Sequence, residues 1–362
     1  MVTNVRALSA TATQAPRRER TPSKFTLYGF TLTACVAYVG LVVGWQTLRF
    51  TPVGGWWAFE LLDIFGLLLY APLLPLLLLA MLVANRRAGL WLMVPLVVLA
   101  WEYGPLFLPR AVPRLNAPGA ETQGQPLRVL TANLLLSNQS VTAVGGLLLM
   151  ERPDLVAIQE LSPAMADHLG RELRQELPYQ LLEPSADHSG LGILSRYPFL
   201  TEVAGGDLPR PCFCQRVVVD LDGHKTTLVN VHPWPPEMTA RRLARLPIPT
   251  AFDPGQTSRA IETALADVHQ RPGALLVAGD FNTSDRQPFY RQLGRGLQDT
   301  HREVGWGLGF TFPSIALEGL PLLSIIRIDY IFHDRSVVAR AARTGVTPGS
   351  DHLHVVADLV VR

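Results

Sequence analysis

The stretch Ala274-Leu-Leu-Val-Ala-Gly-Asp-Phe-Asn282 is the most informative part of this 362-residue chain. Its run of apolar residues is typical of a buried β-strand. An acid and a carboxamide, Asp280 and Asn282, follow this strand at once. Ligands commonly bind at the ends of strands in folds that combine sheets and helices. The stretch therefore predicts a sheet that carries polar side chains at its rim.

Four further motifs place oxygen-rich or imidazole side chains directly after apolar segments. They are Thr-Ala-Asn133-Leu, Ile-Gln-Glu160, Asn-Val-His232-Pro and Ser-Asp351-His352. The numbered residues of these motifs, together with Asp280 and Asn282, comprise three acids, two carboxamides and two histidines. Any one of them has an ordinary explanation as a turn, a helix cap or a solvated charge. Their joint occurrence indicates a phosphoester hydrolase that uses a divalent metal.

Apolar patterning predicts more strands than helices after residue 126. Strands are expected at residues 127–131, 153–159, 191–195, 216–221, 226–231, 274–278, 328–332 and 355–361. Helices are expected at residues 164–177 and 258–269. Because strands and helices alternate, the fold class is α/β or α+β with a large sheet core.

Three apolar stretches precede the motifs, at about residues 25–45, 64–84 and 89–108. Each approaches the ~20 residues that cross a bilayer, so we expect an all-α transmembrane region at residues 25–109. A signal peptide is the alternative for the first stretch, but its apolar core is too long for one. Pro72 and Pro75 interrupt the second stretch, which is nevertheless too short to cross twice.

Basic residues predict the orientation of these spans. Residues 1–24 carry five Arg and Lys, and Arg86 and Arg87 lie between the second and third spans, whereas the first loop has only Arg49. The positive-inside rule places residues 1–24, Arg86 and Arg87 in the cytoplasm. We therefore expect a multi-pass protein of the inner membrane. A linker at residues 110–126 would lead to an extracytoplasmic catalytic domain at residues 127–362.

Net charge argues against general nucleic-acid binding. Residues 126–362 contain 22 Lys and Arg against 25 Asp and Glu, a balance of about −3. Proteins that bind nucleic acid without sequence preference usually need a cationic surface, because phosphate neutralisation dominates their affinity. A slightly acidic domain does not meet that requirement.

The acids and carboxamides suggest a magnesium site, since Mg²⁺ prefers oxygen ligands. Glu160 is the leading ligand, supported by Asn133, Asp280 and Asp351. Of Asp280 and Asn282, one can orient a water or the metal while the other donates an amide hydrogen bond to a phosphoryl oxygen. Mn²⁺ or Ca²⁺ are alternatives to Mg²⁺, and one or two ions are expected.

Two histidines are candidates for proton transfer. His352 can act as a general base or as a cation beside the developing charge, and Asp329 can fix its tautomer. His232 can protonate or hydrogen-bond the phosphate. A lone histidine in a proline-rich loop is, however, more often a surface residue without a catalytic role.

In their order along the chain these motifs resemble the endonuclease/exonuclease/phosphatase superfamily, also called the DNase I-like fold. The matching motifs are Thr-Ala-Asn133, Gln159-Glu160, Gly279-Asp280-Phe281-Asn282, Arg327-Ile328-Asp329-Tyr330 and Ser350-Asp351-His352. The resemblance implies a four-layer sandwich of two β-sheets flanked by helices. It extends to the apolar stretches, because a subset of bacterial members carries several spans before the catalytic domain.

The resemblance also implies a role for each site residue. Those roles are Asn133 and Glu160 at the metal, Asp351 near it, Asp280 orienting the attacking water, Asn282 and His232 contacting phosphate, and Asp329 paired with His352. One position departs from the abasic-site nucleases, which have a tyrosine where this chain has His188. That departure argues against a nuclease of that kind, although His188 can still contact the phosphate of a substrate.

The fold alone does not choose a substrate, because the superfamily cleaves DNA, RNA, phosphoinositides, sphingomyelin and nucleotides. The tether and the acidic domain favour a membrane-tethered phosphodiesterase or phosphatase acting on lipid or envelope phosphoesters. The alternatives are an extracytoplasmic nuclease with the same site and a non-enzymatic protein with a dead hydrolase domain. The expected partners are a lipid or nucleic-acid phosphoester and the bilayer, and no obligate protein partner is indicated.

Two local segments bear on the lipid hypothesis. Residues 305–326 form a Gly-rich, apolar insertion, interpreted either as a packed loop or as a lid that dips into the membrane. Arg241, Arg242 and Arg245 form a cationic cluster that meets anionic headgroups or is merely a solvated helix face.

Overall fold

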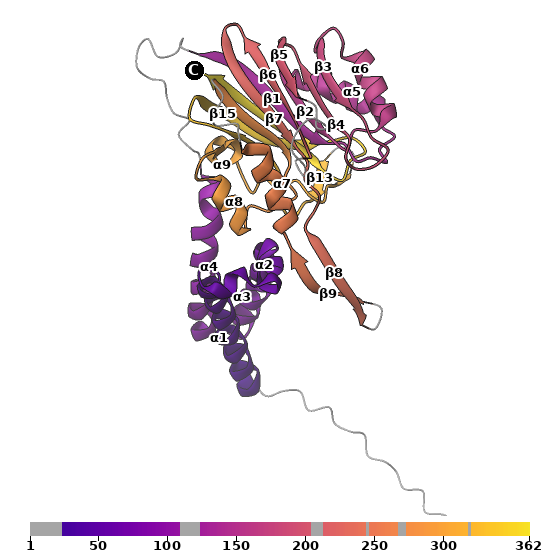
Figure 1. Ribbon diagram of the computed structural model, residues 1–362. Helices are drawn as coiled ribbons and strands as arrows, with labels where there is room; N and C mark the ends of the chain where they lie inside the picture. The colour runs from indigo at the N-terminus through magenta and orange to yellow at the C-terminus, as the bar shows by residue number, and fades with distance from the viewer. Residues whose placement is uncertain (1–23, 109–123, 204–212, 244–245, 267–272, 318–319) are drawn as a thin grey trace, which may run out of the picture. The chain divides into compact units, whose positions relative to one another are not determined.

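The computed structural model describes residues 24–108, 124–203, 213–243, 246–266, 273–317 and 320–362 (Figure 1). The chain divides into two compact units. Met1–Val43 and Pro72–Leu96 form the first, which we call the helical unit. Gly44–Ala71 and Val97–Arg362 form the second, which we call the sandwich unit. The sandwich unit thus includes segments that lie well before residue 127.

Two six-stranded sheets make up most of the sandwich unit. The first has the order β15-β16-β1-β2-β4-β3, with β15 (Val337–Val346), β16 (Leu353–Val361), β1 (Gln125–Asn133), β2 (Leu155–Gln159), β4 (Leu191–Ser195) and β3 (Tyr179–Glu183). The second has the order β11-β14-β10-β7-β6-β5, with β11 (Gln298–Asp299), β14 (Asp329–His333), β10 (Ala274–Asp280), β7 (His224–Val231), β6 (Cys214–Leu221) and β5 (Phe199–Val203). The pairs β1–β2 and β7–β10 are parallel. Each sheet is therefore mixed, with its parallel pair at the centre.

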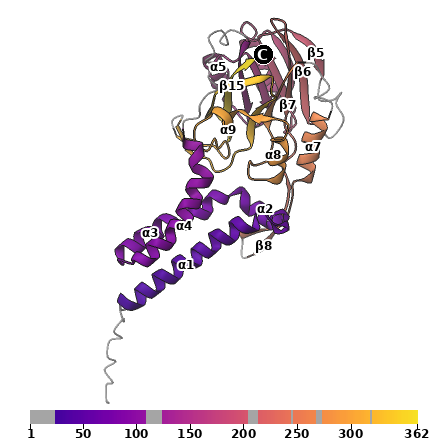
Figure 2. The ribbon, with the colours of Figure 1, turned by 90° about the vertical axis from the view of Figure 1, so that its left-hand side faces the viewer.

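Three apolar clusters define four layers. The largest lies between the two sheets and joins residues such as Val129 and Leu276. A second lies between the first sheet and the helices α5 (Val141–Glu151) and α6 (Pro163–Glu172). A third lies between the second sheet and the helices α7 (Gly255–Leu265) and α8 (Pro288–Leu293). Figures 1 and 2 show the sheets stacked face to face with helices outside, which is the four-layer sandwich that the sequence predicted.

Side chains that alternate between the two faces of a strand explain how one strand contributes residues to two clusters. Val129 of β1 belongs to the cluster between the sheets, and Leu130 belongs to the cluster under α5 and α6. Successive side chains of a strand point to opposite faces, so a strand that is covered on both sides is apolar throughout. The continuous apolar runs at residues 274–278 and 155–158 follow from this double coverage.

Several elements were absent from the sequence-based prediction. They are β3, β5, β15, α5, α8, α9 (Thr300–Val304), and the hairpins β8 (Glu237–Leu243) with β9 (Leu246–Asp253) and β12 (Ile315–Leu317) with β13 (Leu320–Leu323). Arg241 and Arg242 are exposed on β8, so the interpretation of this cluster as a helix face is wrong. Arg245 lies outside the described residues.

The apolar insertion at residues 305–326 is partly packed. The Trp306 ring is 71% exposed but lies edge-on against Phe107, with ring centroids 5.3 Å apart. The Gly307 amide donates a hydrogen bond to the Leu106 carbonyl at 2.8 Å. The insertion therefore contacts the short helix η3 (Gly104–Phe107). Residues 318 and 319 lie outside the described part of the chain.

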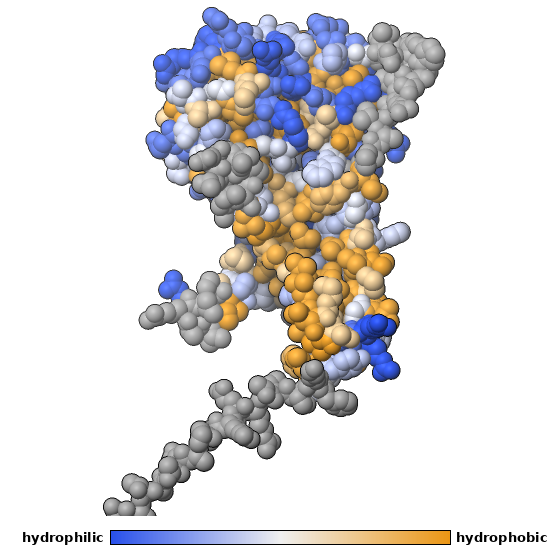
Figure 3. Space-filling model, turned by 180° about the vertical axis from the view of Figure 1, so that it is seen from behind, coloured by the Kyte–Doolittle hydropathy of each residue, from blue (hydrophilic) through white to orange (hydrophobic). Residues whose placement is uncertain are grey.

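Among the described residues, two helices are long and apolar enough to cross a membrane, and they suggest that the protein associates with one. The candidate spans are Thr26–Leu48, within α1 (Lys24–Leu48), and Arg86–Phe107, which covers α4 (Arg86–Tyr103) and η3. Exposed side chains such as Leu41 in α1 and Val97 in α4 give these helices apolar surfaces. Figure 3 shows apolar residues gathered over the helices, whereas polar residues predominate over the sheets.

The second predicted span is not one continuous helix. It consists of α2 (Trp57–Ile64), η2 (Gly66–Tyr70) and α3 (Leu73–Leu82), and the chain bends by 75° between Ile64 and Gly66. Gly66 is a weak helix former, and Pro72 lacks the N–H that a continuing helix would need. With the bent pair counted as one span, the described residues contain three candidate spans.

Candidate active site

The ends of the central strands bring the predicted residues together. In the first sheet Asn133 ends β1, and Glu160 directly follows β2. In the second sheet His232 directly follows β7, and Asp280 ends β10. Because each of these pairs of strands is parallel, each sheet presents two carboxyl ends side by side, and the hydrogen bond from Asn133 to Asp280 shows that they lie at the same rim. Asp329 begins the antiparallel β14 and pairs in register with Asp280.

Asp280 lies at the centre of the site and is 1% exposed. The Asn282 amide donates to its Oδ1 at 2.8 Å, and Asn133 Nδ2 donates to its Oδ2 at 3.1 Å. Two imidazole nitrogens lie slightly farther from Oδ2, His232 Nδ1 at 3.6 Å and His352 Nε2 at 3.8 Å. Asp280 thus connects residues from both sheets.

Glu160 is held in a fixed position by donors from three directions. Its Oε2 accepts from the Leu136 amide at 3.0 Å and lies 2.8 Å from His188 Nδ1. Its Oε1 accepts from Asn133 Nδ2 at 3.2 Å. Burial raises the pKa of Glu160, but the hydrogen bonds from Leu136, His188 and Asn133 outweigh burial and hold the pKa below its usual range. The carboxylate is therefore ionised at neutral pH.

His352 and Asp329 form the predicted pair. His352 Nδ1 lies 3.0 and 3.2 Å from the two carboxylate oxygens of Asp329. The Thr311 hydroxyl accepts from the Asp329 amide at 3.3 Å, and the Phe312 ring lies 4.8 Å from the His352 ring. Burial lowers the pKa of His352, but the carboxylates of Asp329 and Asp280 outweigh it and raise the pKa to about 10. His352 is thus an imidazolium at neutral pH.

Asn282 and His188 also line the site. Asn282 Nδ2 donates to the Pro233 carbonyl at 2.9 Å, and its second amide hydrogen remains able to donate elsewhere. Asn282 has a φ of 47°, in the left-handed region. The His188 side chain is half exposed, and its ring orients Glu160.

Backbone strain marks the same place. Glu160 has a φ of 53°, Leu135 of 63° and Asn282 of 47°. Positive φ is unfavourable for residues other than glycine, and such residues cluster at functional sites. Asparagine tolerates this conformation, whereas glutamate and leucine rarely adopt it. The strain at Glu160 is therefore an independent indication that its carboxylate is positioned for function.

The residues of this site fit a hard divalent cation. Glu160 and Asp280 lie on opposite sides of the Asn133 amide, which bridges them. His232 Nδ1 is buried and has no hydrogen-bond partner among the described residues. If the Asn133 amide is turned by 180°, its oxygen takes the place of its nitrogen beside the two carboxylates. The amide oxygen can then serve as a third donor to a cation. A site with carboxylate, amide and imidazole donors is suited to Mg²⁺ or Mn²⁺.

A tighter group of possible ligands consists of Asp280, Asp329 and His352, whose atoms lie within 4.8 Å of one another. This group differs from the predicted ligands Asn133, Glu160 and Asp351. Both Asp329 oxygens already interact with His352, so we favour the side of Asp280 that faces Asn133 and Glu160. Asp351 lines the same space, and its carbonyl accepts from the Ser314 amide at 2.6 Å.

Several supporting residues were missed by the sequence analysis. Gln159 Nε2 donates to Asn230 Oδ1 at 2.7 Å and to Thr131 Oγ1 at 3.1 Å, in the buried space beside the site. The Ser350 hydroxyl donates to the Asn133 carbonyl at 2.7 Å and accepts from the His352 amide at 3.0 Å. The contacts of Gln159 with Asn230 and of Ser350 with Asn133 join residues 71 and 217 positions apart, so short motifs gave no signal for them.

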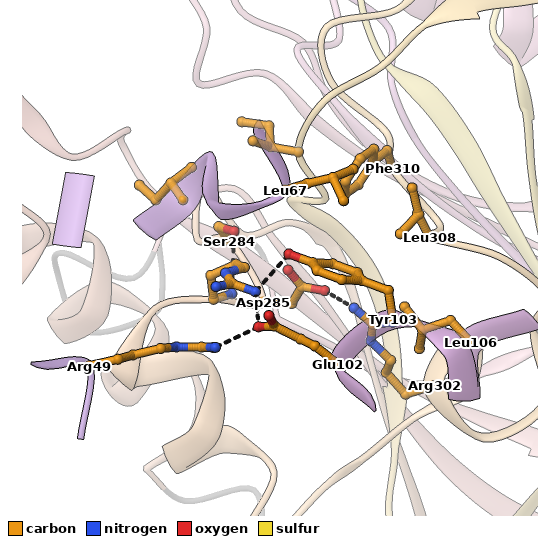
Figure 4. A pocket seen from close by; sticks show the side chains of 13 residues that line it. Arg49, Leu67, Glu102, Tyr103, Leu106, Ser284, Asp285, Arg302, Leu308 and Phe310 are labelled. Carbon is orange, nitrogen blue, oxygen red and sulfur yellow. Dashed lines mark hydrogen bonds and ion pairs between the residues drawn. The ribbon is translucent and has the colours of Figure 1, made fainter. Parts of the chain in front are cut away.

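Arg286 ties the loop after Asp280 to two segments that precede residue 127. Its guanidinium donates to Asp63 Oδ1 at 2.9 Å, to the Asp63 carbonyl at 3.0 Å and to Tyr103 Oη at 2.8 Å, and it also pairs with Glu102. Arg49 contacts Glu102 at 2.6 Å (Figure 4). The ends of α2 and α4 are thereby fixed against the candidate catalytic loop.

A cavity of about 530 Å³ opens over the candidate catalytic residues Asp280 and His352. Its polar lining residues are Glu160, His188, His232, Asp280, Asn282, Ser284, Gln287, Asp351 and His352. Its other walls are largely apolar, and three of the apolar residues, Leu61, Ile64 and Phe65, come from α2 and the residue after it. Among the described residues, neither Lys nor Arg lines this cavity.

The sequence of residues 130–352 matches the model of the Endonuclease/Exonuclease/phosphatase family. The chain belongs to this family. An endonuclease/exonuclease/phosphatase from Bacteroides vulgatus has a similar fold, with a TM-score of 0.50, 17% identity, and coverage of 66% of this chain and 99% of that chain. A D. rerio TDP2 complexed with single-strand DNA product gives a TM-score of 0.48 at 17% identity, covering 65% and 98% of the two chains. No curated protein matches.

Family members are typically metal-dependent phosphoester hydrolases, so a hydrolase of this general class is what membership indicates. At these identities the solved structures of the family support the fold alone. The matched region also begins after α2 and α4. The family therefore accounts for the two sheets and their rim, but not for the wall that α2 contributes to the cavity.

Gly279→Ala should destabilise the sandwich unit severely. Gly279 has a φ of 148°, and a Cβ there would lie 2.0 Å from the Val231 carbonyl oxygen. We expect a loss of about 3 kcal/mol or more, which lowers Tm by roughly 6–12 °C in a domain of this size. Tryptophan fluorescence during heating of the full chain in detergent measures the change.

Gly146→Ala is the matched control, because a Cβ at this position in α5 meets nothing within 4 Å. Alanine should raise stability there by ~0.5–1 kcal/mol. Equal Tm values for the two variants would contradict the close approach of β7 and β10 at the site.

Proposed function

We propose that this chain is a membrane-tethered phosphoester hydrolase that uses a divalent metal and acts outside the cytoplasm. The observation that supports this best is the pair of carboxylates, Glu160 and Asp280, in a cavity lined by histidines and lacking Lys and Arg among the described residues. Two acids so close together repel each other unless a cation lies between or beside them. A bound divalent ion would satisfy them and would also attract a phosphate.

We assign the metal to Glu160, Asn133 and Asp280, with Asp351 at the edge of the same cavity. When bound, the ion would neutralise charge on the phosphoryl oxygens and, as a Lewis acid on those oxygens, make the phosphorus more electrophilic. Mg²⁺ is the first candidate and Mn²⁺ the second, because the donors are mainly oxygens. Glu160 supplies the charge of the site, and the donors around it keep that charge at neutral pH.

In the proposed reaction Asp280 orients a water molecule for attack on phosphorus. The water oxygen forms a bond to phosphorus, the bond from phosphorus to the leaving oxygen breaks, and Asp280 accepts the water proton. His352 acts as a cation and acid rather than as a base, because Asp329 and Asp280 keep it protonated. Its proton goes to the leaving oxygen. The products are an alcohol and a phosphate with one ester bond fewer.

The remaining polar residues would bind the phosphate. His232 lies 3.6 Å from Asp280 Oδ2 and 3.8 Å from Glu160 Oε1, so its ring adjoins both acids. Asn282 can donate its second amide hydrogen to a phosphoryl oxygen. His188 orients Glu160 and is exposed enough to reach the substrate.

The proposed three-span tether is supported by the relative directions of α1 and α4. Asn85 Nδ2 donates to the Tyr28 carbonyl at 3.1 Å, so the start of α4 lies beside the start of α1. Arg49 and Glu102 pair just after α1 and near the end of α4. The two helices are therefore parallel, and residues 49–85 must return across the same distance. This return supports three crossings even though the middle one is bent.

Glu160→Gln should weaken metal binding and activity together. The amide retains the shape of the side chain but removes its negative charge. We expect the affinity for Mn²⁺ to fall at least about tenfold, since even outer partners of metal sites contribute 10–100-fold. Calorimetric titration of the full chain and hydrolysis of bis(p-nitrophenyl) phosphate measure the two effects. Glu202→Gln, an exposed acid on β5, is the control. Unchanged metal affinity in Glu160→Gln would remove Glu160 from the metal site.

His352→Ala should lower turnover while metal affinity stays near that of the parent. Loss of an acid usually reduces the rate by ~10²–10⁴-fold, and excess metal should not restore it. The same titration and the same ester separate this variant from Glu160→Gln. His224→Ala, on the exposed start of β7, is the control. Near-normal turnover in His352→Ala would show that the proposed acid is wrong.

Reporters at two positions test the topology. With three crossings, a reporter at Arg87 should be cytoplasmic and one after Arg362 should be extracytoplasmic. If the bent pair enters and leaves on one side, both assignments reverse. A protease-protection assay on intact spheroplasts distinguishes the two arrangements. Reporters on the same side would contradict both.

A further inference from the structure

Helix α2 forms part of the wall of the candidate active site, although it lies outside the region that matches the family. Leu61, Ile64 and Phe65 line the same cavity as Asp280 and His352. All three side chains are partly buried, whereas Leu62 on the same helix is 57% exposed. α2 thus turns one apolar face toward the site.

Polar residues of α2 hold this face in place. Gln287 Nε2 donates to Glu60 Oε1 at 3.1 Å, and Arg286 binds both the carboxylate and the carbonyl of Asp63. Trp45 Nε1 also donates to Asp63 Oδ1, at 3.0 Å. Because Gln287 and Arg286 belong to the loop that carries Asp280, the apolar wall and the proposed catalytic acid are fixed to the same piece of chain.

The lining beside α2 is also apolar. Trp234 and Pro235 follow His232, and Met238 and Phe252 are paired across the β8–β9 hairpin. Met238 is 58% exposed and Trp234 is 36% exposed. Phe312 packs on the His352 ring. A group bound beside the phosphate would therefore meet hydrocarbon and aromatic surfaces.

We infer that this cavity binds a phosphoester whose body is a hydrocarbon chain, that is, a lipid phosphoester, an inference that rests on the proposed function. A nucleic acid would bring further phosphates, which need cationic partners, and neither Lys nor Arg lines the cavity among the described residues. A free phosphate would leave the apolar walls unused. A hydrocarbon chain gains free energy from each methylene that leaves water. The apolar wall is continuous with a segment that has the hydropathy of a membrane span.

A series of p-nitrophenyl alkyl phosphates tests this inference on the full chain in lipid nanodiscs with Mn²⁺. The methyl, butyl and octyl esters differ only in the hydrocarbon chain. Because each buried methylene gains up to about fourfold, kcat/KM should be at least ~100-fold higher for the octyl than for the methyl ester. The p-nitrophenyl ester of thymidine 5′-phosphate, a nucleotide, should be hydrolysed no faster than the methyl ester.

Variants in the two walls separate binding in the cavity from partition into the nanodisc. Leu61→Ser and Met238→Ser should each lower the ratio of octyl to methyl kcat/KM at least about fivefold. Leu62→Ser, on the exposed face of α2, should keep the parental ratio. Met238 is exposed on a hairpin, so this variant tests the proposal even if Leu61→Ser fails to fold.

The outcomes distinguish two kinds of failure. If the parent hydrolyses neither the methyl nor the octyl ester with metal, the proposed function itself is wrong and the inference falls with it. If the parent hydrolyses the methyl ester but chain length has no effect, only the lipid assignment is overturned. The same result follows if Leu61→Ser, Met238→Ser and Leu62→Ser have equal ratios, or if the thymidine ester is preferred.

Discussion

The crowding of acids at one rim of the sandwich is the constraint on which the rest of the site depends. Glu160, Asp280 and Asp329 come from the ends of three strands, and the first two line a cavity without Lys or Arg among the described residues. Carboxylates in a partly buried place repel one another and favour any cation that fits. In this chain the groups that offset this repulsion are histidines and amide donors, and the proposed divalent ion would add to them. The protonation of His352 follows from the same crowding.

The sequence predicted the strands that are apolar throughout and the residues at their ends. The residues of β2, β4 and β10 are buried along the whole strand, so their composition identifies them as strands without knowledge of the fold. The site residues follow these strands at once, which made short motifs informative. Polar or half-exposed strands such as β3, β5 and β8 have no comparable signal, because neighbours far away in the chain decide their burial.

The contribution of α2 could not be predicted from the sequence for a related reason. Leu61, Ile64 and Phe65 read as part of an apolar span, since hydropathy does not distinguish a lipid environment from the wall of a cavity. The contact that places α2 at the cavity, and not in lipid, joins Asp63 to Arg286, which lies 223 residues later in the chain. The domain boundary expected at residues 110–126 is likewise only the place where the composition changes from apolar to polar. The compact sandwich unit begins much earlier, at Gly44.

The contacts of Arg286 indicate that the two sheets alone do not complete this site. Its guanidinium is satisfied by Asp63, Glu102 and Tyr103, all of which precede residue 127. Without those partners Arg286 would turn toward water, and the loop that carries Asp280 and Asn282 would lose its anchor. The cavity would also lose the wall made by α2. The family fold therefore supplies the polar residues at the strand ends. The segments that adjoin the apolar helices hold the loop in place. They also form the surface against which the rest of a substrate must fit.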